Sequence, residues 1–242
     1  MRFINVNAIV SGGAAGIGRA TAVRLATEGA QIGIADLDLD GATTVVRTTG
    51  GIAVRVDISD VDAVELAVNE LAVELGSVDL LVNCAGWDLA RPFVHTDSDF
   101  WLKVVAVNLV GPIAVTHATL PHMSDGSAIV NVSSDAGRVG SSGEAVYSGA
   151  KGRVIAFTKA LAREMAHRRI RVNAVAPGPT DTAFLASFDE TGKLAEAMTK
   201  QTPLKKLATP DDVAAAICFL GSSDAAHITG QVSSVSGDLT MV

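Results

Sequence analysis

Short apolar runs rich in β-branched residues alternate along the chain with longer segments in which apolar residues recur at helical spacing. An apolar run without internal alternation is typical of a strand that is buried on both faces of a sheet. We expect strands over residues 4–10, 31–35, 52–56, 79–83, 128–132, 171–174 and 232–235. We expect helices to begin near Gly16, Leu39, Ser59, Asp97, Glu144, Thr191 and Thr209.

This alternation predicts an α/β fold: a single doubly wound (Rossmann) domain over residues 1–242, with a parallel sheet of about seven strands and helices on both faces. The length of 242 residues suits one domain with a full core. No internal repeat or linker-like segment divides it. In such folds ligands bind beyond the carboxyl ends of the strands, so residues that follow the strands are the candidates for function.

A glycine-rich turn, from Ser11 to Gly18, follows the first expected strand and leads into an amphipathic segment. Glycines let the backbone turn tightly and approach a pyrophosphate, which a helix N-terminus then stabilises. Surface loops also collect glycine, but a strand before the turn and a helix after it favour a phosphate-binding turn. The turn therefore predicts a dinucleotide site.

Asp36 ends the second expected strand. A carboxylate at this position can accept hydrogen bonds from the adenosine ribose hydroxyls, and it would repel a 2′-phosphate. No arginine interrupts the glycine turn or follows Asp36 closely. The alternative is that Asp36 is only a turn residue in an acidic stretch that reaches Asp40. We expect NAD rather than NADP as the cofactor.

Two further strand ends carry residues that suit the same crevice. Asp57 closes the third expected strand, where it can accept a hydrogen bond from an adenine amino group or cap the next helix, although Ser59 is the better cap. Asn83 closes the fourth and leads into Ala85 and Gly86, whose small side chains let the backbone lie against a cofactor. Ligand-suited residues therefore lie at the ends of the first four strands.

Tyr147 and Lys151 are spaced i and i+4 on an expected helix, downstream of Ser134 at the end of the fifth strand. A phenol loses its proton near pH ~10, and an ammonium on the same helix face would lower that pKa. The chain has one tyrosine, which is Tyr147. Such a pair can also be a solvated helix face, so its interpretation depends on the residues around it.

Composition and charge narrow the function classes. The chain is 48% hydrophobic, which indicates a core buried on several sides and apolar subunit interfaces. No uninterrupted apolar run reaches the ~18 residues of a membrane span, and the N-terminus lacks a signal-peptide layout. Two cysteines form no disulfide framework or metal spacing, so we expect a cytoplasmic protein without a metal. With a formal charge of −7 and no basic block, we expect neither nucleic acid nor membrane as a partner.

Taken in order, the motifs resemble those of the short-chain dehydrogenase/reductase family. The resemblance covers nearly the whole chain and is highly specific because the elements occur jointly: the glycine turn, Asp57, an Asn-x-Ala-Gly motif, Asn108, Ser134, a Tyr-x-x-x-Lys motif and Pro177-Gly178. It implies an NAD-dependent alcohol dehydrogenase or ketoreductase with a small-molecule substrate. It also implies a homotetramer, with the helices after Gly111 and over residues 147–165 packed against partner subunits.

The resemblance assigns roles residue by residue. Tyr147 would be the acid/base on the substrate oxygen, which Ser134 would hold by a hydrogen bond. Lys151 would lower the pKa of Tyr147 and bind the nicotinamide ribose, and Asn108 would hold a water that links Lys151 to solvent. The implied cofactor contacts are Gly12, Gly16, Ile17, Gly18, Asp36, Leu37, Asp57, Ile58, Asn83, Ala85, Gly86, Tyr147, Lys151, Pro177, Gly178, Thr180 and Thr182.

Three stretches, residues 85–88, 137–147 and 177–183, resemble one branch of the family, the 2-hydroxycyclohexanecarboxyl-CoA dehydrogenases. This likeness implies a cyclic or β-hydroxyacyl-CoA as the substrate. The implied substrate contacts are Ser134, Trp87, Arg138, Ser141 and Ser142. A packed ring is an equal interpretation of Trp87, and a surface salt bridge is an equal interpretation of Arg138.

Residues 183–206 match the mobile substrate lid of the family. Its lysines could meet CoA phosphates, although a solvated helix face is the simpler interpretation; they are Lys193, Lys200, Lys205 and Lys206. Within the class, the alternative activity is a 3-oxoacyl-(acyl-carrier-protein or CoA) reductase. An enoyl reductase would space its Tyr and Lys more widely. From another class, the alternative is a non-catalytic NAD(H)-binding sensor, although such relatives usually lose members of the tetrad that is complete here.

Overall fold

In the computed structural model, which describes residues 1–187, 189 and 191–241, seven strands form one parallel sheet in the order β3-β2-β1-β4-β5-β6-β7. This is the doubly wound order that the alternation predicts. The strands are β1 (Asn7–Ser11), β2 (Gln31–Asp36), β3 (Ile52–Arg55), β4 (Val78–Asn83), β5 (Met123–Val132), β6 (Arg171–Pro177) and β7 (Val232–Val235). The chain reverses its direction of winding between β1 and β4, which pair directly, and the ligand crevice of such sheets lies at this point.

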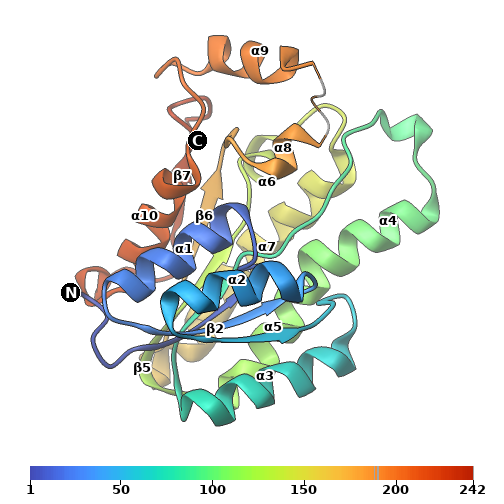
Figure 1. Cartoon of the computed structure of the whole chain (residues 1–242). Helices are drawn as coiled ribbons and strands as arrows, with labels where there is room; N and C mark the ends of the chain where they lie inside the picture. The colour runs from blue at the N-terminus through green and yellow to red at the C-terminus, as the bar shows by residue number, and fades with distance from the viewer. Residues whose placement is uncertain (188, 190, 242) are drawn as a thin grey trace.

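Helices cover both faces of the sheet (Figure 1). The buried apolar residues of α1, α2 and α10 pack on one face and those of α3, α5 and α7 on the other. The helices are α1 (Gly16–Thr27), α2 (Leu39–Thr49), α3 (Val61–Leu75), α4 (Ser98–Val105), α5 (Gly111–Thr119), α6 (Ala136–Val139), α7 (Ala145–Glu164), α8 (Ala183–Ala186), α9 (Lys193–Gln201) and α10 (Pro210–Gly221).

Strand β1 shows why its sequence is an apolar run. Ala8 and Val10 belong to the core under α1, α2 and α10, whereas Ile9 belongs to the core under α3, α5 and α7. All three are fully buried. Because successive side chains point to opposite faces, a strand covered on both sides needs apolar residues at every position.

Most element starts agree with the sequence prediction, although β5 begins at Met123 rather than at residue 128 and β6 ends at Pro177 rather than at residue 174. Two further differences have local causes. The first strand begins at Asn7 rather than Ile4, because Asn5 adopts a left-handed conformation with φ of 61°. The third helix begins at Val61, since the Asp60 carboxylate accepts a hydrogen bond from the Ala63 N–H and caps it. Neither candidate cap named from the sequence, Asp57 or Ser59, has this role.

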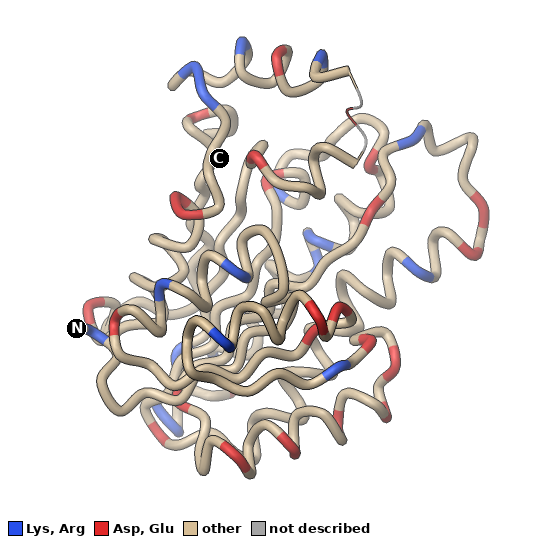
Figure 2. The backbone as a smooth tube through the Cα atoms, in the orientation of Figure 1, with Lys and Arg blue, Asp and Glu red and all other residues tan. Residues whose placement is uncertain are grey.

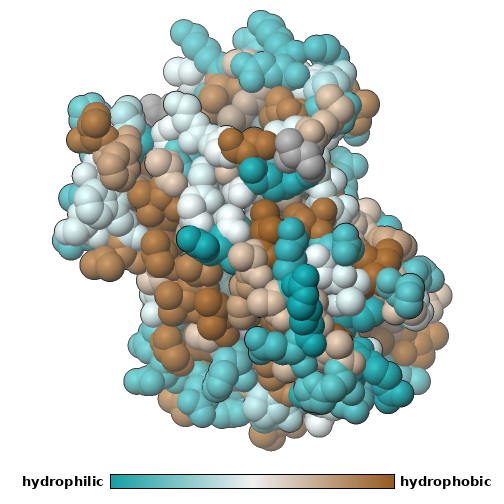
Figure 3. All heavy atoms as spheres, turned by 180° about the vertical axis from the view of Figure 1, so that it is seen from behind, coloured by the Kyte–Doolittle hydropathy of each residue, from teal (hydrophilic) through white to brown (hydrophobic). Residues whose placement is uncertain are grey.

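Residues Ser98–His122 form one continuous helical segment that is long and apolar enough to cross a membrane by length and composition. Its most apolar window is 44% buried against the rest of the molecule. Seen from behind, hydrophobic surface forms a band along the side where α4 and α5 lie (Figure 3). Trp101, Leu102 and Ile113 are among the exposed apolar side chains of this segment.

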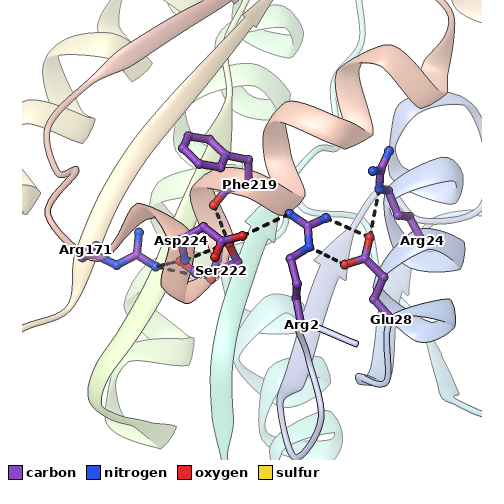
Figure 4. Close-up of polar contacts among 8 residues, drawn as sticks. Arg2, Arg24, Glu28, Arg171, Phe219, Ser222 and Asp224 are labelled. Atoms are coloured by element: carbon purple, nitrogen blue, oxygen red, sulfur yellow. Dashed lines mark hydrogen bonds and ion pairs between the residues drawn. The ribbon is translucent and has the colours of Figure 1, made fainter.

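A network of charged and carbonyl groups joins α1, β6 and α10 at the amino ends of the strands (Figure 4). The guanidinium of Arg2 donates to both Glu28 oxygens, at 2.5 and 2.8 Å, and Arg24 donates to the same carboxylate. Arg171 donates to the carbonyls of Leu220, Gly221 and Ser222 at the end of α10. This network stabilises the edge of the sheet opposite to the carboxyl ends, where the candidate site lies.

Candidate active site

A cavity of about 750 Å³ opens at the carboxyl ends of the strands. It is continuous from the glycine turn and Asp36 at one end to Tyr147 and the C-terminal residues at the other. The candidates that line it are Gly12, Gly16, Ile17, Gly18, Asp36, Leu37, Asp57, Ile58, Ala85, Gly86, Trp87, Ser134, Ser141, Tyr147, Lys151, Pro177, Gly178, Thr180 and Thr182. The fold therefore brings together most of the residues that the sequence singled out.

The glycine turn is shaped by close backbone contacts. Gly12 has φ of 72°, and a Cβ atom there would lie 2.6 Å from the Ala85 backbone. A Cβ on Gly18 would lie 2.0 Å from the Gly12 carbonyl oxygen. Helix α1 starts in this turn, and its N-cap residue Ala15 has no side-chain atom that can accept a hydrogen bond from the first turn. The first N–H groups of α1 are thus available to an anion, so the turn fits a dinucleotide pyrophosphate.

The cavity-lining carboxylates of Asp36 and Asp57 are held by local donors. Asp36 accepts the Ala14 N–H and the Asp38 N–H, both at 2.9 Å. The Asp57 carboxylate accepts hydrogen bonds from the Ser59 hydroxyl and from the Ser59 backbone N–H. These hydrogen bonds lower the pKa of Asp57. Both groups therefore face the cavity as fixed hydrogen-bond acceptors, which suits ribose hydroxyls and an amino group.

At the other end of the cavity, Tyr147 lies on the first turns of α7, and Ser134 lies directly after β5. A hydrogen bond joins their side chains. Burial raises the pKa of Tyr147 above its ordinary value, and the carboxylates of Glu144 and Asp88 raise it further, whereas the Ser134 hydrogen bond lowers it. The protein alone therefore holds the phenol protonated, as a proton donor to a ligand oxygen.

Lys151 is 2% exposed, and its Nζ atom donates to the Val132 carbonyl at 2.9 Å. Nζ lies 5.7 Å from the centroid of the Tyr147 ring. Burial lowers the pKa of Lys151 to about 8. The expectation that Lys151 itself depresses the pKa of Tyr147 is thus corrected: the ammonium is bound to a carbonyl, and burial controls the pKa of both groups.

Asn108 lies in a π-helical turn, Ala106–Val110, between α4 and α5, and it is fully buried. Its amide Nδ2 donates to the carbonyls of Trp87 and Val104, and its Oδ1 accepts the Trp87 N–H at 3.2 Å. A Cβ on Gly86 would meet this Oδ1 at 3.0 Å and Lys151 Nζ at 3.4 Å. Oδ1 keeps a second lone pair, so it is the atom of Asn108 that can accept a hydrogen bond from a water near Lys151.

Asn83 is placed differently from the expectation. Its amide donates to Thr116 at 2.9 Å and to Asn131 at 2.8 Å, and Asn131 donates in turn to Thr158. Asn83 is 2% exposed and is not among the residues that line the cavity. The amide therefore joins β4 to β5 and α5 inside the protein, and a contact of Asn83 with a cofactor stays a prediction.

Two proposed substrate residues also lie away from the cavity wall. Arg138 donates to the Asp135 carboxylate at 3.2 Å, and both side chains are largely buried. Ser142 is exposed and does not line the cavity. Trp87 does line it, with its ring between Phe100 at 5.8 Å and the ammonium of Lys103 at 4.0 Å. The ring is therefore both packed and part of the wall.

Helices α8 and α9 lie in the upper part of the view in Figure 1 and belong to the predicted lid 183–206, of which residues 188 and 190 lie outside the described part. Phe184 and Met198 of this region line the cavity, and the Phe184 ring lies 6.5 Å from that of Tyr147. Lysines occur along α9 and in the segment that follows it (Figure 2). Lys200 pairs with Glu196 at 2.6 Å and Lys206 lies 3.9 Å from Asp212, so these two cations already have acidic partners.

Sequence reasoning missed several residues of the cavity. Glu144 and Asp135 line it, and so do Leu239 and Thr240 from the C-terminal segment. Glu144 was considered only as a helix start, three residues before Tyr147. Leu239 and Thr240 come after the last expected strand, residues 232–235, but they belong to none of the motifs that singled out the other candidates.

Comparison with known proteins adds to this geometry. The sequence profile described as Enoyl-(Acyl carrier protein) reductase matches residues 12–240. The chain is 35% identical over 248 residues to the 3-oxoacyl-[acyl-carrier-protein] reductase FabG of Thermotoga maritima, with 100% of both chains covered. It is 38% identical over 242 residues to the cis-4-hydroxycyclohexanecarboxylate dehydrogenase of Sinomonas cyclohexanicum, covering 97% of this chain and 96% of that protein.

Among solved structures, a short-chain dehydrogenase/reductase of Brucella melitensis, titled a glucose/ribitol dehydrogenase, superposes with a TM-score of 0.94. The two chains are 32% identical, and the alignment covers 100% of this chain and 99% of the other. The fold is therefore shared over the full length.

The buried ammonium of Lys151 predicts a pH-dependent stability. Its pKa of about 8 in the folded protein lies below the unfolded value of 10.5, so folding disfavours the charged form. The free-energy cost of burying the Lys151 ammonium is fully present below pH 8. It disappears as the pH rises towards 10.5, because over this window Lys151 keeps its proton only in the unfolded chain. We expect Lys151→Met to be stabilised relative to wild type by up to about 3 kcal/mol at pH 7, an advantage that shrinks by pH 10.

Urea unfolding of both proteins between pH 7 and 10 measures this difference. The matched control is Lys159→Met, which removes an exposed lysine from the same helix. Equal pH dependence for the two variants would contradict the buried charge at Lys151.

Proposed function

The chain belongs to the short-chain dehydrogenase/reductase family, and from this premise we propose an NAD-dependent oxidoreductase that interconverts a secondary alcohol and a ketone on a cyclic or β-hydroxyacyl-CoA. The observation that carries the proposal is the juxtaposition of Ser134, Tyr147 and Lys151 in the same cavity as the glycine turn. A proton donor at the substrate oxygen and a bound nicotinamide at the substrate carbon are the two requirements of this reaction.

In the proposed mechanism, Ser134 and Tyr147 both hydrogen-bond to the substrate oxygen. During reduction the Tyr147 O–H transfers its proton to that oxygen, and during oxidation the phenolate removes the alcohol proton. When bound, the oxidised nicotinamide supplies the hydride acceptor and a positive charge that opposes the effect of Glu144 on the pKa of Tyr147. Lys151 holds the nicotinamide ribose, and the Asn108 Oδ1 holds the water through which protons reach solvent.

The alternative of a non-catalytic NAD(H)-binding sensor is disfavoured because Asn108, Ser134, Tyr147 and Lys151 are all present. The last three line the cavity, and Asn108 accepts the N–H of Trp87, a residue of the cavity wall. The substrate class draws support from the cavity wall, where Trp87, Met198 and Phe184 offer an apolar surface to a ring or an acyl chain, the Phe184 ring at 6.5 Å from that of Tyr147. One compared relative acts on a hydroxycyclohexane ring and another on an acyl-carrier thioester, as their names state. A 3-oxoacyl reductase is therefore the second candidate.

Turnover of a substrate panel tests the proposed function. The panel contains hydroxyacyl-CoA thioesters, free cyclic alcohols and the corresponding ketones, each with NAD(H). We expect turnover of thioesters by wild type, and loss of at least about 1,000-fold in kcat for Tyr147→Phe with NADH affinity kept, because only the proton donor is removed. Ser148→Ala, which alters a neighbouring hydroxyl on the same helix, is the control.

The outcomes separate the candidates. Turnover with NADH only in the direction of 3-oxoacyl thioester reduction would favour the reductase. Binding of NADH without turnover of any panel member would favour the sensor. A Tyr147→Phe variant with the wild-type rate would refute the assigned acid/base.

The preference for NAD rests on Asp36, a fixed carboxylate in the cavity. Among the described residues that line the cavity, the basic side chains are those of Lys103 and Lys151. Arg55 pairs in register with Asp36 from strand β3, but it does not line the cavity. We expect kcat/KM for NAD⁺ to exceed that for NADP⁺ by at least about 100-fold. Asp36→Asn should reduce this ratio at least about tenfold, since the charge repulsion of the 2′-phosphate is removed. A wild-type preference for NADP⁺ would overturn the assignment.

The exposed apolar side chains of α4 and α5 support the proposed homotetramer, because such bands mark subunit contacts. Light scattering of the purified protein at micromolar concentration should give four times the mass of the chain. Leu102→Glu, which places a charge on this band, should reduce the measured mass. A monomer at these concentrations would contradict the proposal. A cytoplasmic location remains part of it, consistent with the free thiols of Cys84 and Cys218.

A further inference from the structure

Asp135, which directly follows Ser134, carries a buried carboxylate with several donors. It is 4% exposed, and its N–H donates to the Pro177 carbonyl at 2.9 Å. Ser234 Oγ donates across both of its oxygens at 2.9 and 3.0 Å, and Thr240 Oγ1 donates to Oδ2 at 2.5 Å. Arg138 completes the set at 3.2 Å. The bonds to the carboxylate from Ser234, Thr240 and Arg138 are charge-assisted, so they are stronger than an equal number of neutral hydrogen bonds.

These bonds connect parts of the chain that are distant in sequence. Asp135 belongs to the turn that carries Ser134, Ser234 lies on the edge strand β7, and Thr240 lies in the C-terminal segment beyond that strand. Thus the carboxylate joins the catalytic turn to the end of the chain. We refer to Asp135, Ser234 and Thr240 with their hydrogen bonds as the Asp135 clamp.

The C-terminal segment forms part of the cavity wall. Leu239 and Thr240 line the cavity, together with Asp135. Apart from the clamp, this segment has weak backbone support within the described residues: Leu239 N–H donates to Ser236 at 3.3 Å, and Leu204 N–H donates to Gly237 at 3.3 Å. It has no regular secondary structure, so side-chain hydrogen bonds must fix its position.

Packing alone would not require a carboxylate here. A buried charge costs free energy unless donors surround it, and an apolar side chain could fill the same space without that cost. The carboxylate at this position is therefore explained better by the residues that it binds, Ser234 and Thr240, than by packing. The group that it holds is a wall of the reaction cavity, next to the serine that contacts the substrate oxygen in the proposed mechanism.

We propose that Asp135 is a positioning residue: its clamp fixes Leu239 and Thr240 as a rigid wall of the substrate pocket, and this wall limits the size of the substrate that reaches Tyr147. The limit on size rests on the proposed function, whereas the fixing of the C-terminal segment does not. Two measurements therefore test the two statements separately.

Hydrogen exchange tests the fixing of the segment without any substrate. Thr240→Val and Ser234→Ala each remove one donor of the clamp at nearly constant shape, and Asp135→Asn removes its charge. We expect the peptide after Val235 to exchange at least tenfold faster in these variants than in wild type. The matched control is Thr229→Val, which removes the hydroxyl that accepts the Val172 N–H at the opposite end of the β6–β7 pair. Wild-type exchange in the clamp variants would overturn the clamp.

Substrate selectivity tests the wall. The probes are hydroxyacyl-CoA thioesters of increasing chain length and cyclic alcohols of increasing ring size, assayed with NAD⁺. We expect the ratio of kcat/KM between the best substrate and the next larger probe to fall at least fivefold in Thr240→Val and Ser234→Ala, mainly through KM. Thr229→Val should stay within twofold of wild type, which a general loss of stability would not predict.

The outcomes are distinct. Faster exchange with unchanged selectivity would overturn the role of the segment in specificity while keeping the clamp. A wild-type protein that oxidises no probe would refute the proposed function and, with it, the limit on size, while the exchange data would still decide the clamp. If Asp135→Asn does not fold, the two hydroxyl variants carry both tests.

Discussion

A parallel sheet with both faces covered leaves polar side chains few places to lie. In this protein the strands are apolar at nearly every position because helices pack on both sides, so polar groups gather at the two ends of the sheet. At the amino ends the polar groups serve stability, as in the network around Arg2 and Arg171 (Figure 4). At the carboxyl ends they line one cavity that extends from Asp36 to Tyr147.

Within this cavity, burial controls the chemistry more than pairwise contacts do. It lowers the pKa of Lys151 to about 8 and raises the pKa of Tyr147. The two groups respond in opposite directions because each is shifted towards its neutral form. Tyr147 is thus a neutral proton donor beside Ser134. The positive charge of an oxidised nicotinamide in the cavity would lower the pKa of Tyr147. Site and cofactor are therefore parts of one electrostatic arrangement.

The sequence was sufficient for the fold and for most of the site. The helix starts predicted near Gly16, Leu39 and Thr209 lie within one residue of the observed starts, and the buried strands follow from their apolar runs. What it could not supply was direction: Asn83 ends a strand at the correct edge, yet its amide turns into the interior. Nor could local patterns reveal the bond between Asp135 and Thr240, because it joins residues that only the completed fold brings together.

The central claim is that a hydride passes between a secondary alcohol and nicotinamide in this cavity. Deuterium transfer from a labelled substrate alcohol tests this claim most directly. The alcohol is labelled at its carbinol carbon, the reaction is run with NAD⁺ in ordinary water, and the NADH is examined by NMR. The account predicts one deuterium at C4 of the nicotinamide, on a single face, with the substrate oxygen proton released to solvent. Ketone formation without deuterium in the NADH would contradict it.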